Sequence, residues 1–504
     1  MLFEAEIDDI SGLLWSDDSV LQWKHEKTVG VLMALGKLFE TATERTDCET
    51  EFLRLLRWCE LAAEEPFELL FCDPRAYHWA RVAFDLVASV HRGASLSNGT
   101  REYVRDLGMS DLAAALAYHL NQFSVFVASL AVCSQTPIAF SPVRLDIPAF
   151  LPGTVFSISH PSSQVSLRGV EADGTLMLSV DGADVLCPTR NPPEQLECGA
   201  TLHVAPQVDC GQGRITLQPH AFNVPGLKDI RSVSSAQVKD QYAVVETLEE
   251  TLRLIRAFGP EIHHQMGRYL RTIAFKSPGA GGIFNTSCSR LPGASIFTAS
   301  PHPLVLADDL IHEFHHNRLF ALEEKFAFLT EDLSQSRPTT FYSPWRDDPR
   351  PIYGLFHAAF VFERVHAFSI AAIVSGQLNE MDRAYASSRA ARLAIQLQIT
   401  LAQLLCWGNF SGEGRAICEA ISESLKRDLA TAEGLGIGWE TPLVQFDPQT
   451  GYQITADETG EAETVRGSLI QHIRECDVNH RTEQVVKDHF EQVSDFATAM
   501  AELV

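Results

Sequence analysis

Residues 303–322 read PLVLADDLIHEFHHNRLFAL, and this stretch decides the architecture around the candidate site. Pro303 suits the first turn of a helix, and apolar residues on both sides of residues 312–316 supply a buried helical body. His312 and His316 are four residues apart, which on a helix is about 400° of rotation and about 6 Å of rise. Both imidazoles then project from one face. We predict a helix that presents two metal-binding histidines.

The segment 312–316 also matches the pattern HExxH. In zinc peptidases with this pattern Glu313 would be the general base, acting on a zinc-bound water. Glu313 lies about 100° round the helix from His312, so it can reach a water beside the ion. In an iron enzyme Glu313 need not act as a base. A third interpretation is that the histidines only pack and form hydrogen bonds, because the pattern also occurs by chance.

A mononuclear metal site needs a third protein ligand, and the candidates follow the motif in the sequence. His357 precedes an apolar helix predicted over 358–370, and Glu363 and His366 lie within that helix. His357 and Glu363 are about 240° apart on a helix, so they cannot both face one ion, and His366 points roughly opposite to His357. The residues alone place His357 only slightly ahead of Glu363.

Two arginines lie in the proline-restrained stretch YSPWRDDPRP, residues 342–351. Arg346 and Arg350 offer rigid guanidinium forks that suit a carboxylate ligand. The alternative is that they pair with the neighbouring Asp347 or Asp348 or with other acidic residues. Both interpretations stay open at the level of the sequence.

Outward from the motif, the chain predicts an α+β fold that is mainly helical with a small antiparallel β module. We expect four parts: a helical N-terminal unit (1–135), a β-rich module (136–235), a helical metal-binding catalytic unit (236–430), and a C-terminal hairpin with charged helices (431–504). Alternating runs predict strands at 155–159, 164–167 and 175–180, and a hairpin that pairs 201–204 with 214–217. The Gly/Ser/Pro-rich residues 277–300 are expected to form a loop, and 444–455 a hairpin.

Composition limits the kinds of partner. The 504 residues carry 40 Lys+Arg against 65 Asp+Glu, a formal net charge of -25. Such a charge disfavours binding to nucleic acid or to an anionic membrane. The 11 cysteines form no CxxC pair, which fits reduced thiols. The N-terminus lacks the features of a signal peptide, and no apolar run reaches the roughly 18–20 residues that span a bilayer. We therefore expect a cytoplasmic protein.

Taken together, four motifs resemble one known family: LPG at 291–293, HEFHH at 312–316, YSPWRDDPRP at 342–351 and GLFH at 354–357. They are similar to the HExxH-type, 2-oxoglutarate-dependent peptide β-hydroxylases, which modify ribosomally made peptide natural products in bacteria. The resemblance covers about residues 285–370. It implies that the fold is not the double-stranded β-helix of common 2-oxoglutarate oxygenases.

The resemblance also implies the cofactors and the roles of individual residues. The enzyme would be a non-haem Fe(II) dioxygenase that uses 2-oxoglutarate and O2, with three protein ligands that leave open positions on the iron. The implied roles are as follows: iron ligands His312, His316 and His357; binding of the distal carboxylate of 2-oxoglutarate by Arg346 or Arg350; and a lining of the cosubstrate pocket by Ser287 or Ser289.

The expected partner is a peptide, a ribosomal precursor, with no nucleic acid and no membrane. There are two alternative functions. The first is a zinc metallopeptidase with Glu313 as general base, and the second is a non-catalytic binding or scaffold protein with buried histidines.

Overall fold

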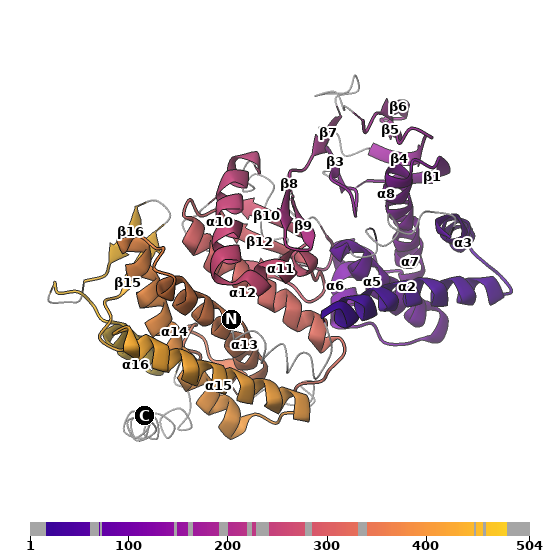
Figure 1. Cartoon of the computed structure of the whole chain (residues 1–504). Coiled ribbons are helices and arrows are strands. Elements are labelled where there is room, and N and C mark those ends of the chain that lie inside the picture. The colour runs from indigo at the N-terminus through magenta and orange to yellow at the C-terminus, as the bar shows by residue number, and fades with distance from the viewer. Residues whose placement is uncertain are drawn as a thin grey trace. The chain divides into compact units, whose positions relative to one another are not determined.

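The computed structural model describes residues 17–60, 70, 73–145, 149–159, 165–190, 200–218, 224–227, 241–277, 285–330, 340–447, 450–456 and 460–480. The chain divides into two compact units. The N-terminal unit comprises Ser19–Glu249 and His264–Ala299, and the C-terminal unit comprises Met1–Asp18, Glu250–His263 and Ser300–Val504. Each unit is described by itself below, with the labels of Figure 1.

The helices of the N-terminal unit are α2 (Asp17–Thr41), α3 (Asp47–Cys59), α5 (Pro74–Arg92), α6 (Asn98–Asp106), α7 (Leu112–Asn121) and α8 (Phe123–Ser134), followed much later by the 3-10 turn η2 (Tyr242–Val244). Four of them begin where a side chain accepts a hydrogen bond from a free backbone N–H group, namely α3, α5, α6 and α7. A reciprocal capping box joins Thr46 and Glu49 at the start of α3, and Gly93 ends α5 with a φ of 65°, which glycine adopts without strain.

The described residues between α8 and η2 contain nine strands: β1 (Ile138–Arg144), β2 (Ala149–Phe150), β3 (Phe156–Ser159), β4 (Val165–Val170), β5 (Leu176–Val180), β6 (Ala183–Cys187), β7 (Thr201–Val204), β8 (Gln207–Cys210) and β9 (Gly213–Leu217). Seven of them form two antiparallel sheets, one in the order β1-β4-β5-β6 and the other in the order β2-β3-β7. The strands predicted near 155–159, 164–167 and 175–180 correspond to β3, β4 and β5, although residue 164 lies outside the described residues.

The third sheet of the unit is mixed and has the order β11-β12-β10-β9-β8, with β10 (Thr272–Lys276), β11 (Thr286–Ser287) and β12 (Ala294–Thr298). β10 runs parallel to both β9 and β12, and every residue of β12 is buried, as expected for parallel strands covered on both faces. The predicted 277–300 loop therefore contains two strands.

The predicted hairpin between 201–204 and 214–217 was wrong. Both segments are strands, but β7 pairs with β3, whereas β9 pairs with β8 on one side and β10 on the other. Strand β8, which lies between β7 and β9 in the sequence, is the strand that forms a hairpin with β9. Strand pairing depends on partners distant along the chain, so local alternation identified the strands without identifying their neighbours.

The C-terminal unit is a helical assembly built around α13. Its helices are α12 (Pro303–Glu323), α13 (Ile352–Val374), α14 (Glu380–Trp407), α15 (Gly412–Gly434) and α16 (Val465–His480), and the boundary between the units falls within α10 (Val245–Phe258) and α11 (Pro260–Tyr269). Two short antiparallel pairs join β13 (Thr340–Phe341) to β14 (Arg350–Pro351) and β15 (Val444–Asp447) to β16 (Gly451–Ile454). The latter pair confirms the hairpin predicted at 444–455.

Helix α13 packs against α12, α14 and α15, and Figure 1 shows it beside α14 and α15. It is apolar on nearly all sides and largely buried, which is the pattern of a central helix. Helix α12 begins at Pro303, as predicted. Of the charged helices expected in the C-terminal part (431–504), the structure describes α16; residues beyond 480 lie outside the described part of the chain.

Within the described residues, two helical stretches are long and apolar enough to cross a membrane by length and composition, Leu112–Ser134 and Ile352–Val374. This differs from the expectation that no segment would reach that length. The buried share of the apolar window is 67% in the first stretch and 72% in the second, as in core helices, so the finding is weak evidence for a membrane span.

The protein is thus α+β, mainly helical with small antiparallel and mixed sheets, and it does not have the double-stranded β-helix fold. The division into units differs from the four expected parts. The segments 1–135 and 136–235 fall largely within one unit, and the sheet that contains β9 and β10 joins residues from both sides of the expected boundary at 235.

Candidate metal centre

His312 and His316 lie next to each other on α12, one helical turn apart. Their Nε2 atoms are 3.1 Å apart, and the ring centroids are 4.7 Å apart with the planes at 76°. Metal–nitrogen bonds of about 2.1 Å place two imidazole nitrogens about 3.4 Å apart on a tetrahedral ion and about 3.0 Å apart at adjacent octahedral positions. The separation of the two nitrogens is therefore compatible with two ligands of one ion.

Burial keeps both imidazoles neutral at pH 7. It lowers the pKa of His312 to about 4, opposed by the Asp308 carboxylate and aided by the Arg389 guanidinium. Burial together with His312 and His357 holds the pKa of His316 well below its ordinary value. Neutral imidazole is the form that binds metals. Without a metal, one of the two Nε2 atoms must carry a hydrogen and donate it to the other.

His357, on the first turns of α13, lies beside this pair. Its ring is 5.7 Å from that of His316 and nearly parallel to it. Its Nε2 atom lies 2.8 Å from Oε1 of Glu323, whose other oxygen accepts a hydrogen bond from the Tyr353 hydroxyl at 3.0 Å. Burial, aided by the Glu323 carboxylate, raises the pKa of Tyr353, so the hydroxyl stays protonated and can donate.

Glu323 is a residue that the sequence reasoning missed. It follows His316 by seven residues, about two helical turns, so it returns to the same face of α12. That spacing was the available signal. In the described part of the chain no three His, Cys, Asp or Glu side chains converge closely enough to hold a metal ion. The histidine pair thus supplies two candidate ligands. His357 and Glu323 are the candidates for a third, but they are hydrogen-bonded to each other, and that bond must break before either binds an ion.

Glu363 and His366 lie on a different face of α13, toward α15. The Ser424 hydroxyl donates to Oε1 of Glu363, and Nδ1 of His366 lies 3.3 Å from Oδ2 of Asp428. Both side chains are almost fully buried there. Of the three third-ligand candidates named from the sequence, the structure brings only His357 next to the histidine pair.

Glu313 is buried within α12, with 3% of its surface exposed. Its backbone carbonyl accepts a hydrogen bond from the Asn317 side chain at 2.9 Å. The nitrogen of His316 that faces away from His312, Nδ1, is buried and has no hydrogen-bond partner among the described residues. Metal-bound histidines usually donate from that second nitrogen, so His316 lacks one support that such sites commonly have.

Arg346 and Arg350 both pair with Asp348, at 3.4 Å and 3.1 Å. This is the alternative left open by the sequence. The Arg346 side chain is 61% exposed and that of Asp348 53%. Exposed pairs of this kind contribute about 0–1 kcal/mol, so they do not prevent either arginine from binding a carboxylate ligand instead.

The stretch that holds these arginines is connected to the histidine pair through aromatic rings. Trp345 stacks on Phe362 of α13 at 4.8 Å with an interplanar angle of 11°, and the Phe362 ring lies 4.6 Å from that of His312. The indole nitrogen of Trp345 is buried and has no hydrogen-bond partner within the described residues. These rings form an apolar wall beside His312, which limits access of water to that side.

A second feature that the sequence did not reveal is an ion pair one turn before His312. Arg389 of α14 binds both oxygens of Asp308, with the NH2–Oδ1 distance at 3.1 Å. Burial disfavours the charge on Arg389, but Asp308 outweighs it and the pKa of Arg389 is raised. The guanidinium carbon also lies 5.5 Å from the centroid of the Phe362 ring. Arg389 is thus a further cation close to the histidine pair.

Ser287 and Ser289 belong to the N-terminal unit, whereas the histidines belong to the C-terminal unit. Ser287 lies on β11 opposite Ser295, and Ser289 is exposed in the turn that follows. Their expected role beside the cosubstrate stays a prediction.

Comparison with known proteins gives no family for the chain: no protein-family model matches it, and no curated protein sequence matches it either.

Proposed function

We propose that the protein is an Fe(II)- and 2-oxoglutarate-dependent oxygenase that hydroxylates a β-carbon of a ribosomally made peptide in the cytoplasm. The observation that carries the proposal is the pair of neutral Nε2 atoms 3.1 Å apart on a buried helix, with the His357 ring stacked beside them. The motifs of residues 285–370 give the proposal its reaction class. With a net charge of -25, we expect no nucleic-acid partner.

In this proposal His312, His316 and His357 hold the iron, and Glu323 keeps His357 in place or takes its position as ligand. When bound, Fe(II) supplies the redox chemistry that couples oxidation of 2-oxoglutarate by O2 to hydroxylation of the peptide. The protein side chains orient and shield the reacting groups. Phe362 and Trp345 exclude water beside His312, and Arg346, Arg350 or Arg389 offers a guanidinium for the cosubstrate carboxylate.

The experiment is anaerobic addition of Fe(II) and then 2-oxoglutarate to the purified protein, followed by visible absorption spectroscopy for the weak charge-transfer band of the bound pair. We then expect air to produce succinate and to add one oxygen atom to a precursor peptide, as detected by mass spectrometry. Absence of both the band and succinate would exclude the proposal.

The competing function is a zinc metallopeptidase with Glu313 of the motif helix as general base. It predicts tightly bound zinc, cleaved peptide without any need for 2-oxoglutarate, and loss of cleavage in Glu313→Gln. In the oxygenase, Glu313→Gln is expected to retain the charge-transfer band, so this variant separates the two functions. A scaffold protein would bind no metal and would gain no thermal stability from any divalent ion.

A further inference from the structure

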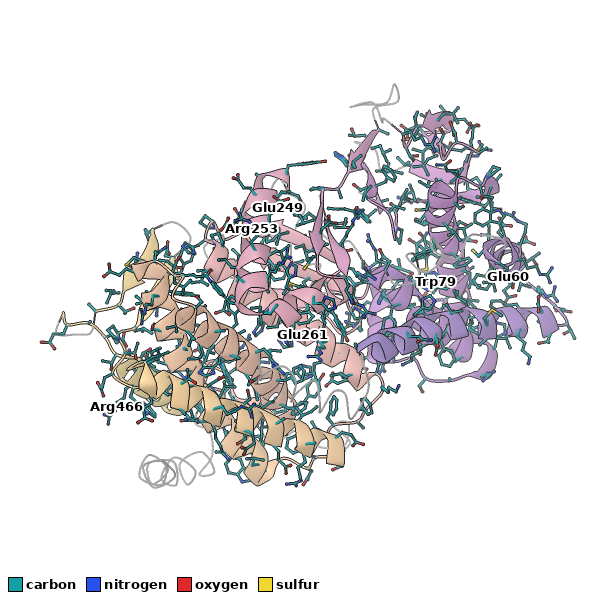
Figure 2. All side chains as sticks on the ribbon, viewed as in Figure 1. Glu60, Trp79, Glu249, Arg253, Glu261 and Arg466 are labelled. Atoms are coloured by element: carbon teal, nitrogen blue, oxygen red, sulfur yellow. The ribbon has the colours of Figure 1, made fainter. Side chains whose placement is uncertain are left out.

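A pocket of about 170 Å³ lies within the N-terminal unit, remote in sequence from the histidine motif. Aromatic side chains from several elements line it: Trp79 of α5, Tyr118 of α7, Phe126 of α8 and Phe150 of β2. Trp79 is labelled in Figure 2. A cavity of about 150 Å³ can hold a benzene ring, so this pocket has the size for one aromatic group.

One wall of the pocket is already satisfied by hydrogen bonds. His119 Nε2 lies 2.9 Å from the carbonyl oxygen of Trp79, so this nitrogen is the donor. Its Nδ1 atom then accepts from the Tyr103 hydroxyl at 2.8 Å, and the Trp79 indole N–H donates to the His119 carbonyl at 3.0 Å. The His119 and Trp79 rings also stack at 5.1 Å. This wall is rigid and offers a ligand mainly an apolar surface.

Two other polar atoms of the lining have no such partners. Nε2 of His78 and Oε1 of Gln218 are buried and make no hydrogen bond within the described residues. The exposed fractions of the two residues are 5% and 3%. A buried polar atom without a partner is costly, and most such atoms in folded proteins are satisfied by protein, water or ligand. The pocket therefore has polar positions that a bound molecule can complete.

The pocket is close to electrically neutral. Among its described lining residues the one cation is Arg75, which binds both oxygens of Asp73 at 2.9 Å and 3.0 Å and lies 4.2 Å from the centroid of the Phe150 ring. Burial lowers the pKa of His78 to about 4 and that of His119 to about 3, so both histidines are uncharged at pH 7. A neutral molecule suits this environment better than an ion, because the described lining presents no unpaired charge to offset the loss of its hydration.

We propose that this pocket binds a neutral aromatic ring bearing one hydrogen-bond donor, as in an indole or a phenol, with the donor hydrogen-bonded to Oε1 of Gln218. The ring source is either a tryptophan or tyrosine side chain of a peptide or a free small molecule; the chemistry of recognition is the same. The proposal does not depend on the metal centre or on the proposed oxygenase activity.

The experiment is a titration of the full chain with indole and with 1-methylindole, which has the ring without the donor, followed by saturation-transfer NMR. We expect saturable binding of indole and binding of 1-methylindole that is about three- to tenfold weaker, the loss expected for one hydrogen bond. N-acetyl-tryptophanamide is the third ligand. Its binding identifies a peptide side chain as the source, and its exclusion identifies a free small molecule.

Two variants test the position of the ring. Gln218→Leu should remove the difference between the two indoles, and Ala149→Phe, at the half-buried edge of the pocket on β2, should abolish binding of both. Gln207→Leu is the matched control, since Gln207 is exposed on β8 and does not line the pocket. If circular dichroism shows that Gln218→Leu is unfolded, the proposal is tested by the comparison of the two indoles on the native protein and by Ala149→Phe. Absence of saturable binding, or binding unchanged by Ala149→Phe, overturns the proposal.

Discussion

The Nε2 atom of His357 lies 2.8 Å from Oε1 of Glu323, so the histidine expected to complete a metal centre is hydrogen-bonded to a carboxylate on the motif helix itself. A carboxylate that binds a metal-ligating histidine is a common support in metal sites. A carboxylate and two histidines are also a common ligand set for non-haem iron. The two roles of Glu323 lead to different results on mutation.

Comparison of His357→Ala with Glu323→Gln assigns the third ligand. If His357 is the ligand, its removal should abolish Fe(II) or Co(II) binding, and Glu323→Gln should weaken binding by about 10–100-fold, as loss of a supporting residue does. Isothermal titration calorimetry with Co(II) measures both variants. The reverse order of the two losses would assign Glu323 as the ligand.

Removal of either motif histidine should have a larger effect than removal of a histidine elsewhere. His312→Ala and His316→Ala are expected to weaken metal binding by more than about 100-fold, because direct ligands contribute more than their supporting residues. The readout is the rise in melting temperature on addition of metal, which reports binding to the folded state. His264→Ala is the control, since His264 is exposed on α11. An undiminished rise in His316→Ala would contradict metal binding by the pair.

The ion pair between Asp308 and Arg389 should stabilise the C-terminal unit only while both partners are present. Asp308→Asn is expected to lower the free energy of unfolding by about 3 kcal/mol, because it leaves the largely buried guanidinium uncompensated. We place the loss at the low end of the usual range since 23% of the Arg389 side chain is exposed. Urea titration measures the loss.

A double variant and a surface pair control this prediction. Asp308→Leu combined with Arg389→Met should recover most of the stability, since two apolar side chains replace a buried ion pair at little cost. Glu423→Gln, which breaks the exposed Lys426–Glu423 pair, should change stability by less than about 1 kcal/mol. Equal losses of unfolding free energy in Asp308→Asn and Glu423→Gln would contradict a larger stabilisation by the buried Asp308–Arg389 pair.

The N-terminal unit should lose stability in acid because of His119. Burial lowers the folded-state pKa of this residue to about 3, below the value of about 6.5 in an unfolded chain. A histidine with a lowered pKa favours the folded state fully above pH 6.5, and this contribution falls as the pH drops toward 3. The slope is about 1.4 kcal/mol per pH unit.

Chemical denaturation between pH 7 and pH 4, followed by Trp fluorescence, measures that dependence. In His119→Gln the slope of the unfolding free energy against pH should decrease by the contribution of the His119 imidazole. The variant is also expected to be less stable than the native protein at pH 7. A slope in His119→Gln equal to that of the native protein would contradict the assignment of the acid sensitivity to His119.

The sequence predicted the local features of the site better than its long-range contacts. Pro303 and the apolar residues around the motif located the start of α12, and helical spacing placed His312 and His316 on one face. The same arithmetic predicted that His357 and Glu363 point in different directions, which the structure shows. These predictions succeeded because a helix fixes the direction of each side chain from its position alone.

Contacts between elements could not be predicted in this way. The approach of Arg389 to Asp308 depends on how α14 packs on α12, 81 residues away in sequence. The sequence left the partners of Arg346 and Arg350 open, and the structure pairs both with Asp348. The ranking of the third-ligand candidates depends on which face of α13 packs against α12. The apolar surface of α13 is nearly uniform, so the sequence does not indicate that face.

The parallel pairing of β9 with β10 determines how the protein can be divided for expression. A fragment that stops near residue 235, where the sequence suggests a boundary, would lack β10 and leave an edge of β9 with unpaired backbone groups next to a buried apolar face. Exposed edges of this kind recruit strands from other molecules. Such a fragment is expected to precipitate. During synthesis, the sheet can form completely only after residues up to about 298 have left the ribosome.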